Sequence, residues 1–208
     1  MLMHLVAGKF VTQALAAAAE LNLAEQLVDG PRTAQETAGP MGVHAPSLYR
    51  LGLFLSKILR ANPHASGILF DLPHVAEGAG RLLGDAGLIA RCQVLCGDFF
   101  TSVPAGCDAY VLKHILHDWD DARCERILSN CRAAMAPGGR VLVVEMVVPP
   151  PGIPSFARLI DLEMLAISSN GKERKEHEFA ELFAKAGLVL ARVVPTQSPY
   201  SVLEAFRA

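Results

Sequence analysis

From Pro63 onward, short apolar runs alternate with segments whose apolar residues recur at helical spacing. Such apolar runs are typical of parallel strands, which are buried on both faces of their sheet. Strands are predicted at GILFDL (67–72), CQVLCGD (92–98), DAYVLKHIL (108–116) and RVLVVEMVV (140–148). Helices are expected between and after them, over residues 75–87, 120–135, 156–168 and 176–186.

The last two apolar runs differ from the others because no helix separates them. LVLARVVPT and YSVLEAFRA are joined by a short Gln-Ser-Pro turn, which predicts an antiparallel hairpin. Alternating strands and helices that end in a hairpin predict an α/β fold, a doubly wound sheet with one reversed strand.

The first part of the chain has a helical pattern. A helix is predicted over Phe10–Leu27, and a second begins at Thr33, where Glu36 completes a capping box. A third is predicted to run without a break over Pro46–Ala61, although Gly52 costs about 1 kcal/mol relative to Ala. This order of helices resembles the start of a winged-helix unit, without strands that would form the wing.

Composition narrows the choice of function. The 208 residues suffice for one domain and a small extra element, and the net charge of -2 argues against a nucleic-acid partner. Apolar stretches are broken by Gly, Lys or Asp before they reach membrane-spanning length, so no membrane contact is expected. The apolar N-terminal segment lacks an early Lys/Arg cluster, so it is interpreted as a packing helix rather than a signal peptide.

The five cysteines form no CxxC pair and lie within strand or helix patterns. We therefore expect reduced thiols in a cytoplasmic protein, and no metal site.

A series of motifs along residues 57–208 is more specific: FDLPHV, GDFF, KHILHDWDD, PGGRVLVVE and NGKER. Together they resemble the small-molecule O-methyltransferases that use S-adenosylmethionine, the family of plant phenolic, acetylserotonin and bacterial polyketide enzymes. The resemblance implies a Rossmann-like class I methyltransferase domain over residues 57–208. It also implies that residues 1–56 are a truncated helical dimerisation segment, so a homodimer through the N-terminal helices is expected.

The cofactor-binding residues are expected at the ends of the first two strands. An acidic residue such as Asp71 can accept both ribose hydroxyls of a nucleoside, although Asp71 could also cap a helix before Pro73. The resemblance implies that Leu72 lies beside it, that Asp98 meets the adenine amino group and that Phe99 stacks on the ring. A turn aspartate and a core phenylalanine would explain the same two residues. Lys113 matches a family position near the adenine and sulfur, or is a solvated lysine at a strand end.

His117, in KHILHDWDD, is the candidate general base. A phenol has a pKa of about 10, so at neutral pH a base must take its proton before the methyl group is transferred. Histidine is neutral enough to accept that proton. His114 or His117 could instead cap the following helix.

Three acids accompany His117. The resemblance implies that Glu145, taken to end the VLVVE strand, and Glu173, in NGKER, flank the histidine and stabilise its protonated form. Asp118 is the neighbouring acid of the same motif. Each could also be a surface carboxylate.

One expected motif is absent. The family's central first strand leads into a loop of the type DVGGGxG that wraps the methionine end of the cofactor, and this chain has no such string. Relative to the family, LYRLGLFLS is joined directly to KILRANP, the pattern of an internal deletion. The strand ending at Asp71 and the strand containing Val111 would then both have an open edge, and we expect them to pair directly.

Two functions therefore follow from the sequence. The first is O-methyl transfer to a hydroxyl of a small aromatic or polyketide-type acceptor. The second is a non-catalytic remnant that binds itself or a relative through its N-terminal helices. A DNA-binding regulator is disfavoured by the acidic balance and the missing wing.

Overall fold

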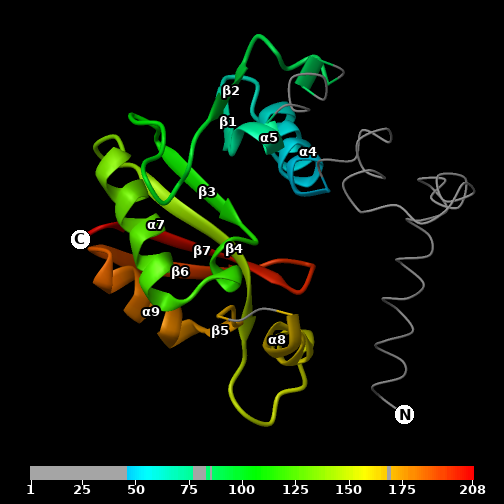
Figure 1. The fold of residues 1–208 in the computed structure, drawn as a ribbon, viewed down its shortest axis with the longest axis vertical. Helices are drawn as coiled ribbons and strands as arrows, with labels where there is room; N and C mark the ends of the chain where they lie inside the picture. Colours follow the sequence, from blue (N-terminus) through cyan, green and yellow to red (C-terminus); the bar gives the residue numbers. More distant parts are fainter. Residues whose placement is uncertain (1–45, 77–82, 85, 168–169) are drawn as a thin grey trace, which may run out of the picture.

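The computed structural model describes residues 46–76, 83–84, 86–167 and 170–208 (Figure 1). The helices predicted over Phe10–Leu27 and from Thr33 lie outside the described residues, as does part of the helix expected over residues 75–87. The division of the chain at residue 56 therefore stays a prediction.

The first described element is α4 (Pro46–Ala61), a single helix as predicted. It continues through the proposed junction at residues 56 and 57 and is followed by Asn62 and Pro63. Its last turns pack on the next strand, since a Cβ added at Gly67 would lie 3.1 Å from Leu55 and 3.4 Å from Leu59. Gly67 thus lets the strand approach the helix closely.

A small parallel sheet follows. It consists of β1 (Gly67–Asp71) and β2 (Cys92–Cys96), with the short helix α5 (Pro73–Ala76) after β1. This sheet and α4 share a separate hydrophobic cluster, formed by Leu59, Leu69, Leu83, Leu88 and Cys92.

The larger sheet has the strand order β3-β4-β7-β6. These strands span Ala109–Lys113, Arg140–Val148, Tyr200–Arg207 and Leu188–Pro195. β3 and β4 are parallel, while β7 is antiparallel to both β4 and β6, which confirms the predicted hairpin and the single reversed strand. A two-residue strand that the pattern did not predict, β5 (Arg174–Lys175), pairs with the end of β4.

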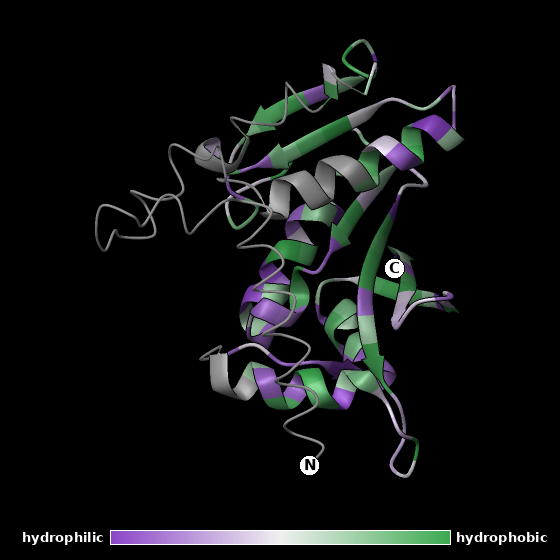
Figure 2. Ribbon diagram, turned by 90° about the vertical axis from the view of Figure 1, so that its right-hand side faces the viewer, coloured by the Kyte–Doolittle hydropathy of each residue, from purple (hydrophilic) through white to green (hydrophobic). Residues whose placement is uncertain are grey.

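Helices α7 (Asp121–Ala134) and α9 (Glu176–Lys185) bury their apolar sides in the main core against this sheet (Figure 1). That core joins Ile127 and Leu128 of α7 and Phe183 of α9 to Val141 and Leu203 of the strands. A third helix, α8 (Phe156–Ile167), packs on the far part of β4. The strands are largely apolar, whereas polar residues gather on the helices (Figure 2). None of the helices in the described ranges is long and apolar enough to cross a membrane.

The prediction that β1 and β3 pair directly is wrong. Within the described residues β1 pairs only with β2, and β3 pairs only with β4, so the strands form two separate sheets. The physical reason is that β1 and β2 bury their apolar side chains in a cluster of their own with α4, without help from β3. Val111 of β3 remains 38% exposed as a consequence.

We expect Phe183→Ala to lower the free energy of unfolding by about 3–5 kcal/mol, because it empties a fully buried site in the main core. Urea denaturation of the whole chain would measure this loss. Val189→Ala, which trims a residue that is 54% exposed, is the control and should change stability by less than about 0.5 kcal/mol. Equal losses in the two variants would contradict the assignment of the core.

Candidate active site

The turn that carries His117 begins where β3 stops. The strand pattern predicted β-structure up to residue 116, but β3 ends at Lys113 because His114 adopts φ 56°, the left-handed region that few non-glycine residues enter. The 3-10 helix η1 (Leu116–Asp118) follows at once and presents His117 beside β4.

Glu145 fixes the position of this turn. Its side chain is 1% exposed and lies within β4, which continues to Val148, rather than at the strand end that we expected. Oε1 accepts hydrogen bonds from the backbone N–H groups of Ile115 and Leu116, each at 2.9 Å. Oε2 lies 2.7 Å from Nδ1 of His117, which donates to the carboxylate. A buried carboxylate that accepts three hydrogen bonds is satisfied, and it holds the imidazole with Nε2 directed away from the sheet.

Asp118 contacts the second ring nitrogen of His117, Nε2. Its Oδ1 lies 3.3 Å from Nε2 of His117, and its side chain is 54% exposed, against 18% for the histidine. Burial alone would lower the pKa of His117. The hydrogen bonds and negative charges of Asp118 and Glu145 outweigh that effect and raise the pKa to about 10. In this structure the imidazole is therefore protonated at neutral pH.

Glu173 completes the group. Its side chain is 5% exposed, and its backbone N–H donates to Asp161 at 2.9 Å. Burial raises the pKa of Glu173 to about 7, helped by the charges of Glu145 and Asp161 and opposed by His117. Its Oε2 is buried and has no hydrogen-bond partner among the described residues.

The same three residues have the spacing of a metal site. One donor atom each from His117, Glu145 and Glu173 lies within 4.8 Å of the others. A metal bound through Nδ1 would have to replace the hydrogen bond between His117 and Glu145. The expectation of no metal therefore stays our prediction.

Sequence reasoning missed Arg174, although it lies next to Glu173 in NGKER. Its guanidinium is 1% exposed and donates to the carbonyl oxygens of Leu116 at 2.7 Å and Trp119 at 2.9 Å. It also donates twice to Oδ1 of Asp121, at 2.7 and 3.1 Å. Two residues earlier, the Lys172 N–H donates to the His117 carbonyl at 2.9 Å. Residues 172–174 thus bind the backbone of the turn that presents His117.

Apart from Lys113, the predicted cofactor residues lie at the strand ends of the small sheet. Asp71 ends β1 and accepts a hydrogen bond from the N–H of Leu72, which is 41% exposed. Asp98 follows β2 and accepts from the N–H of Phe100. The two strand ends are neighbours, because the Gly97 N–H donates to the Asp71 carbonyl at 3.0 Å. Asp98 is exposed and Asp71 is half-buried, so both strand ends reach solvent at one edge of the small sheet.

Phe99 connects this edge to the histidine turn. It lies 4.8 Å from Phe100 and 6.5 Å from Trp119, measured between ring centroids, in edge-to-face geometry. Lys113, at the end of β3, has its Nζ 5.7 Å from the Tyr200 ring and 5.9 Å from the Phe54 ring of α4. The structure therefore brings together His117, Asp118, Glu145 and Glu173. Asp71 and Asp98 form a second pair, and the aromatic contacts link it to Trp119.

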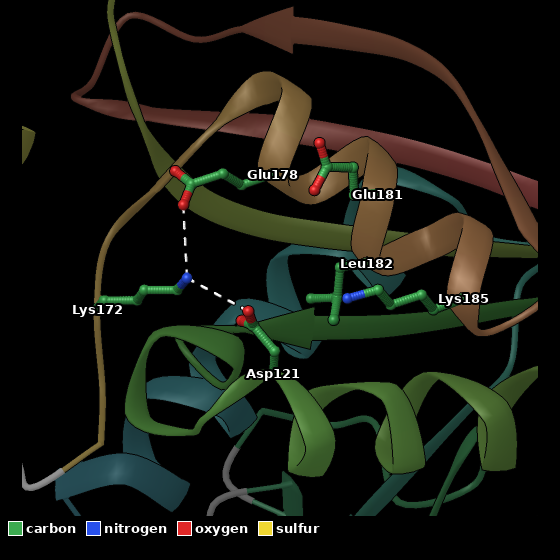
Figure 3. A pocket seen from close by; sticks show the side chains of 6 residues that line it. All are labelled: Asp121, Lys172, Glu178, Glu181, Leu182 and Lys185. Carbon is green, nitrogen blue, oxygen red and sulfur yellow. Dashed lines mark hydrogen bonds and ion pairs between the residues drawn. The ribbon is translucent and has the colours of Figure 1, made fainter.

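A shallow hollow lies elsewhere, between the start of α7 and the outer side of α9 (Figure 3). Lys172 crosses it and pairs with Asp121 at 3.3 Å and Glu178 at 3.4 Å. His117 does not line this hollow, so it is not the candidate site. The lining residues are Asp121, Lys172, Glu178, Glu181, Leu182 and Lys185.

Comparison with known proteins places these features in one family. A sequence model described as an O-methyltransferase domain matches residues 51–189. The phenazine O-methyltransferase of Lysobacter antibioticus is 50% identical over 154 residues, which are 74% of this chain and 45% of that protein. The chain thus spans a little under half the length of this relative.

Solved structures agree. A methyltransferase of calicheamicin biosynthesis, in its SAH-bound form, is 41% identical with a TM-score of 0.70, over 76% of this chain and 46% of that one. An O-methyltransferase of neocarzinostatin biosynthesis, in complex with S-adenosylmethionine and 2-hydroxy-5-methyl naphthoic acid, is 41% identical with a TM-score of 0.68, over the same shares. Because the matched range exceeds half of the chain and contains the turn that carries His117, the chain belongs to the O-methyltransferase domain family.

Proposed function

We propose that the protein transfers a methyl group from S-adenosylmethionine to a hydroxyl of a small aromatic or polyketide-type acceptor, with His117 as the general base. The observation that carries the proposal is the 2.7 Å contact between Nδ1 of His117 and the buried Glu145, which leaves Nε2 as the nitrogen that can face an acceptor. Relatives named as phenazine and 3-amino-4-hydroxybenzoate O-methyltransferases support this acceptor class.

The proton on His117 sets the order of events. Nε2 lies against Asp118, so an acceptor hydroxyl has to take the place of that carboxylate before Nε2 can accept a proton. Asp118 is more than half exposed and can turn into solvent. Its departure removes one of the two anions that raise the pKa of His117, so the imidazole becomes a base closer to neutral pH. Glu145 remains and stabilises the imidazolium that forms.

The residues at the ends of β1, β2 and β3 would hold the cofactor. Asp71 and Asp98 would bind its hydroxyl and amino groups, Leu72 and Phe99 would border the ring, and Lys113 would lie near the sulfur. When bound, the cofactor supplies an electrophilic methyl group, and the departing thioether needs no proton. The sequence has no glycine-rich loop for the methionine end, so we expect weaker binding than in the full-length relatives.

Two further expectations belong to this proposal. The five cysteines are all unpaired in the structure, which supports a reducing, cytoplasmic setting. A homodimer through the N-terminal helices is proposed from the resemblance alone, because these helices lie outside the described residues.

A second candidate function is favoured by the separation of β1 from β3 and by the missing loop. Here the chain is a non-catalytic remnant that binds itself or a longer relative. Calorimetric titration with S-adenosylmethionine separates the two candidates, because the remnant has no need to bind the cofactor.

For His117→Ala we expect turnover of hydroxylated aromatic acids to fall by about 10²–10⁴-fold, the usual contribution of a general base. Binding of S-adenosylmethionine, measured by calorimetry, should stay within about threefold of wild type. The control is His177→Ala, which alters an exposed histidine of α9 and should leave both quantities unchanged. Parallel loss of binding and turnover would mean that His117 is a structural residue.

The variant Asp118→Asn tests how the histidine is charged. It removes one anion while keeping the side chain's shape, so the pKa of His117 should fall from about 10 toward its ordinary value of about 6.5. Titration of the imidazole by NMR would measure the change. Asp108→Asn, at the opposite end of β3, is the control and should not move the midpoint. An unchanged midpoint in Asp118→Asn would show that Asp118 does not hold the proton on Nε2.

Glu173→Gln tests the buried carboxyl through the pH dependence of stability. The pKa of Glu173 is raised in the folded state, so its protonated form is favoured and the stability present below pH 4.5 is lost as the pH rises toward 7. Because Gln cannot ionise, the variant should lack this loss and gain on the order of 2 kcal/mol over wild type between pH 4.5 and 8. Urea unfolding at both pH values measures the difference. Glu181→Gln, on the exposed side of α9, should show no such gain. If the free energy of unfolding depends on pH equally in all three proteins, the raised pKa of Glu173 is refuted.

A further inference from the structure

The turn that presents His117 is held from two sides. Glu145 accepts the N–H groups of Ile115 and Leu116, and the segment 172–174 donates to the carbonyl oxygens of Leu116, His117 and Trp119. The hydrogen bonds to Leu116 and Trp119 come from the Arg174 side chain, whose rigid guanidinium thus reaches both ends of η1.

Burying an arginine is costly unless its charge is paired and its N–H groups are bonded. Asp121, the first residue of α7, pairs with it at 2.7 Å and accepts a second hydrogen bond at 3.1 Å. The buried thiol of Cys124 donates to the same Leu116 carbonyl at 3.2 Å. Burial raises the pKa of this thiol to about 11, so it remains a neutral donor. The side-chain hydrogen bonds of Arg174 thus go either to the turn or to the helix that follows it.

We propose that Arg174 is a positioning residue for His117: together with Asp121 it fixes the backbone of residues 116–119 so that the imidazole stays against Glu145. The inference rests on the proposed function, since it gives a role to the histidine that the reaction uses. A purely structural arginine would stabilise the fold without governing how long His117 remains beside Glu145.

The variant Arg174→Lys separates these two roles. Lysine keeps the positive charge, so the electrostatic field at His117 is nearly unchanged, but it lacks the planar fork that reaches two carbonyls and a carboxylate at once. We expect the NMR titration midpoint of His117 to fall by at least one pH unit, because its contact with Glu145 loosens. We also expect kcat to fall at least tenfold, with the KM for S-adenosylmethionine within about threefold of wild type.

The control is Arg192→Lys, the same exchange at an arginine that pairs with the buried Glu204 in the β6–β7 hairpin, away from the turn. It should leave the His117 midpoint and kcat unchanged even where it lowers stability. If Arg174→Lys folds, by circular dichroism, and leaves both readouts at the wild-type values, the proposal is overturned.

If Arg174→Lys does not fold, Asp121→Asn is the variant to measure instead. Asp121 is half exposed, so this variant should fold and lower the His117 midpoint by a smaller, measurable amount. An unmoved midpoint would overturn the proposal. The titration does not require turnover. An inactive wild-type chain would therefore refute the proposed function, while the His117 midpoint alone would still decide the positioning role.

Discussion

A negative charge buried inside β4 is the constraint on which the site depends. Glu145 cannot remain in the sheet as a carboxylate unless donors surround it, and the chain supplies them by ending β3 early and folding residues 115–117 over it. The turn, the ring orientation of His117 and the need for residues 172–174 to bind the turn's carbonyls all follow from that requirement. Removing the carboxylate would leave three donors without their acceptor and the turn without its fixed shape.

Much of the candidate site could be predicted from the sequence because its residues lie in local motifs. KHILHDWDD places His117 and Asp118 just past a strand, and the family resemblance implies that Glu145 and Glu173 flank the histidine. Arg174 could not be found in this way. An arginine in a polar segment is typical of a surface, and its burial depends on carbonyls 55 and 58 residues away in sequence. The available signal was indirect: five charged residues follow one another at 172–176, and not all of them can face water beside a buried strand.

The arrangement of the strands was predicted well within each sheet and poorly between the sheets. Alternation and turn chemistry are local, so the hairpin, the reversed strand and the continuous α4 were all predicted correctly. Pairing of β1 with β3 was inferred from the cost of an open edge, but α4 gives β1 and β2 enough apolar burial to stand as a separate unit. Backbone hydrogen bonding at an open strand edge is one contribution to strand pairing among several, and here side-chain packing outweighs it.

The aromatic contacts beside the site have an optical consequence. Trp119 is the single tryptophan of the chain, and it lies edge-on to Phe99 and Phe100, next in line after Asp118. The indole fluorescence therefore comes from a ring that contacts Phe99, the residue after Asp98. The same ring lies two residues after His117 in the sequence. The protein thus has an intrinsic fluorescent probe between its two groups of candidate site residues, and no label has to be introduced to observe them.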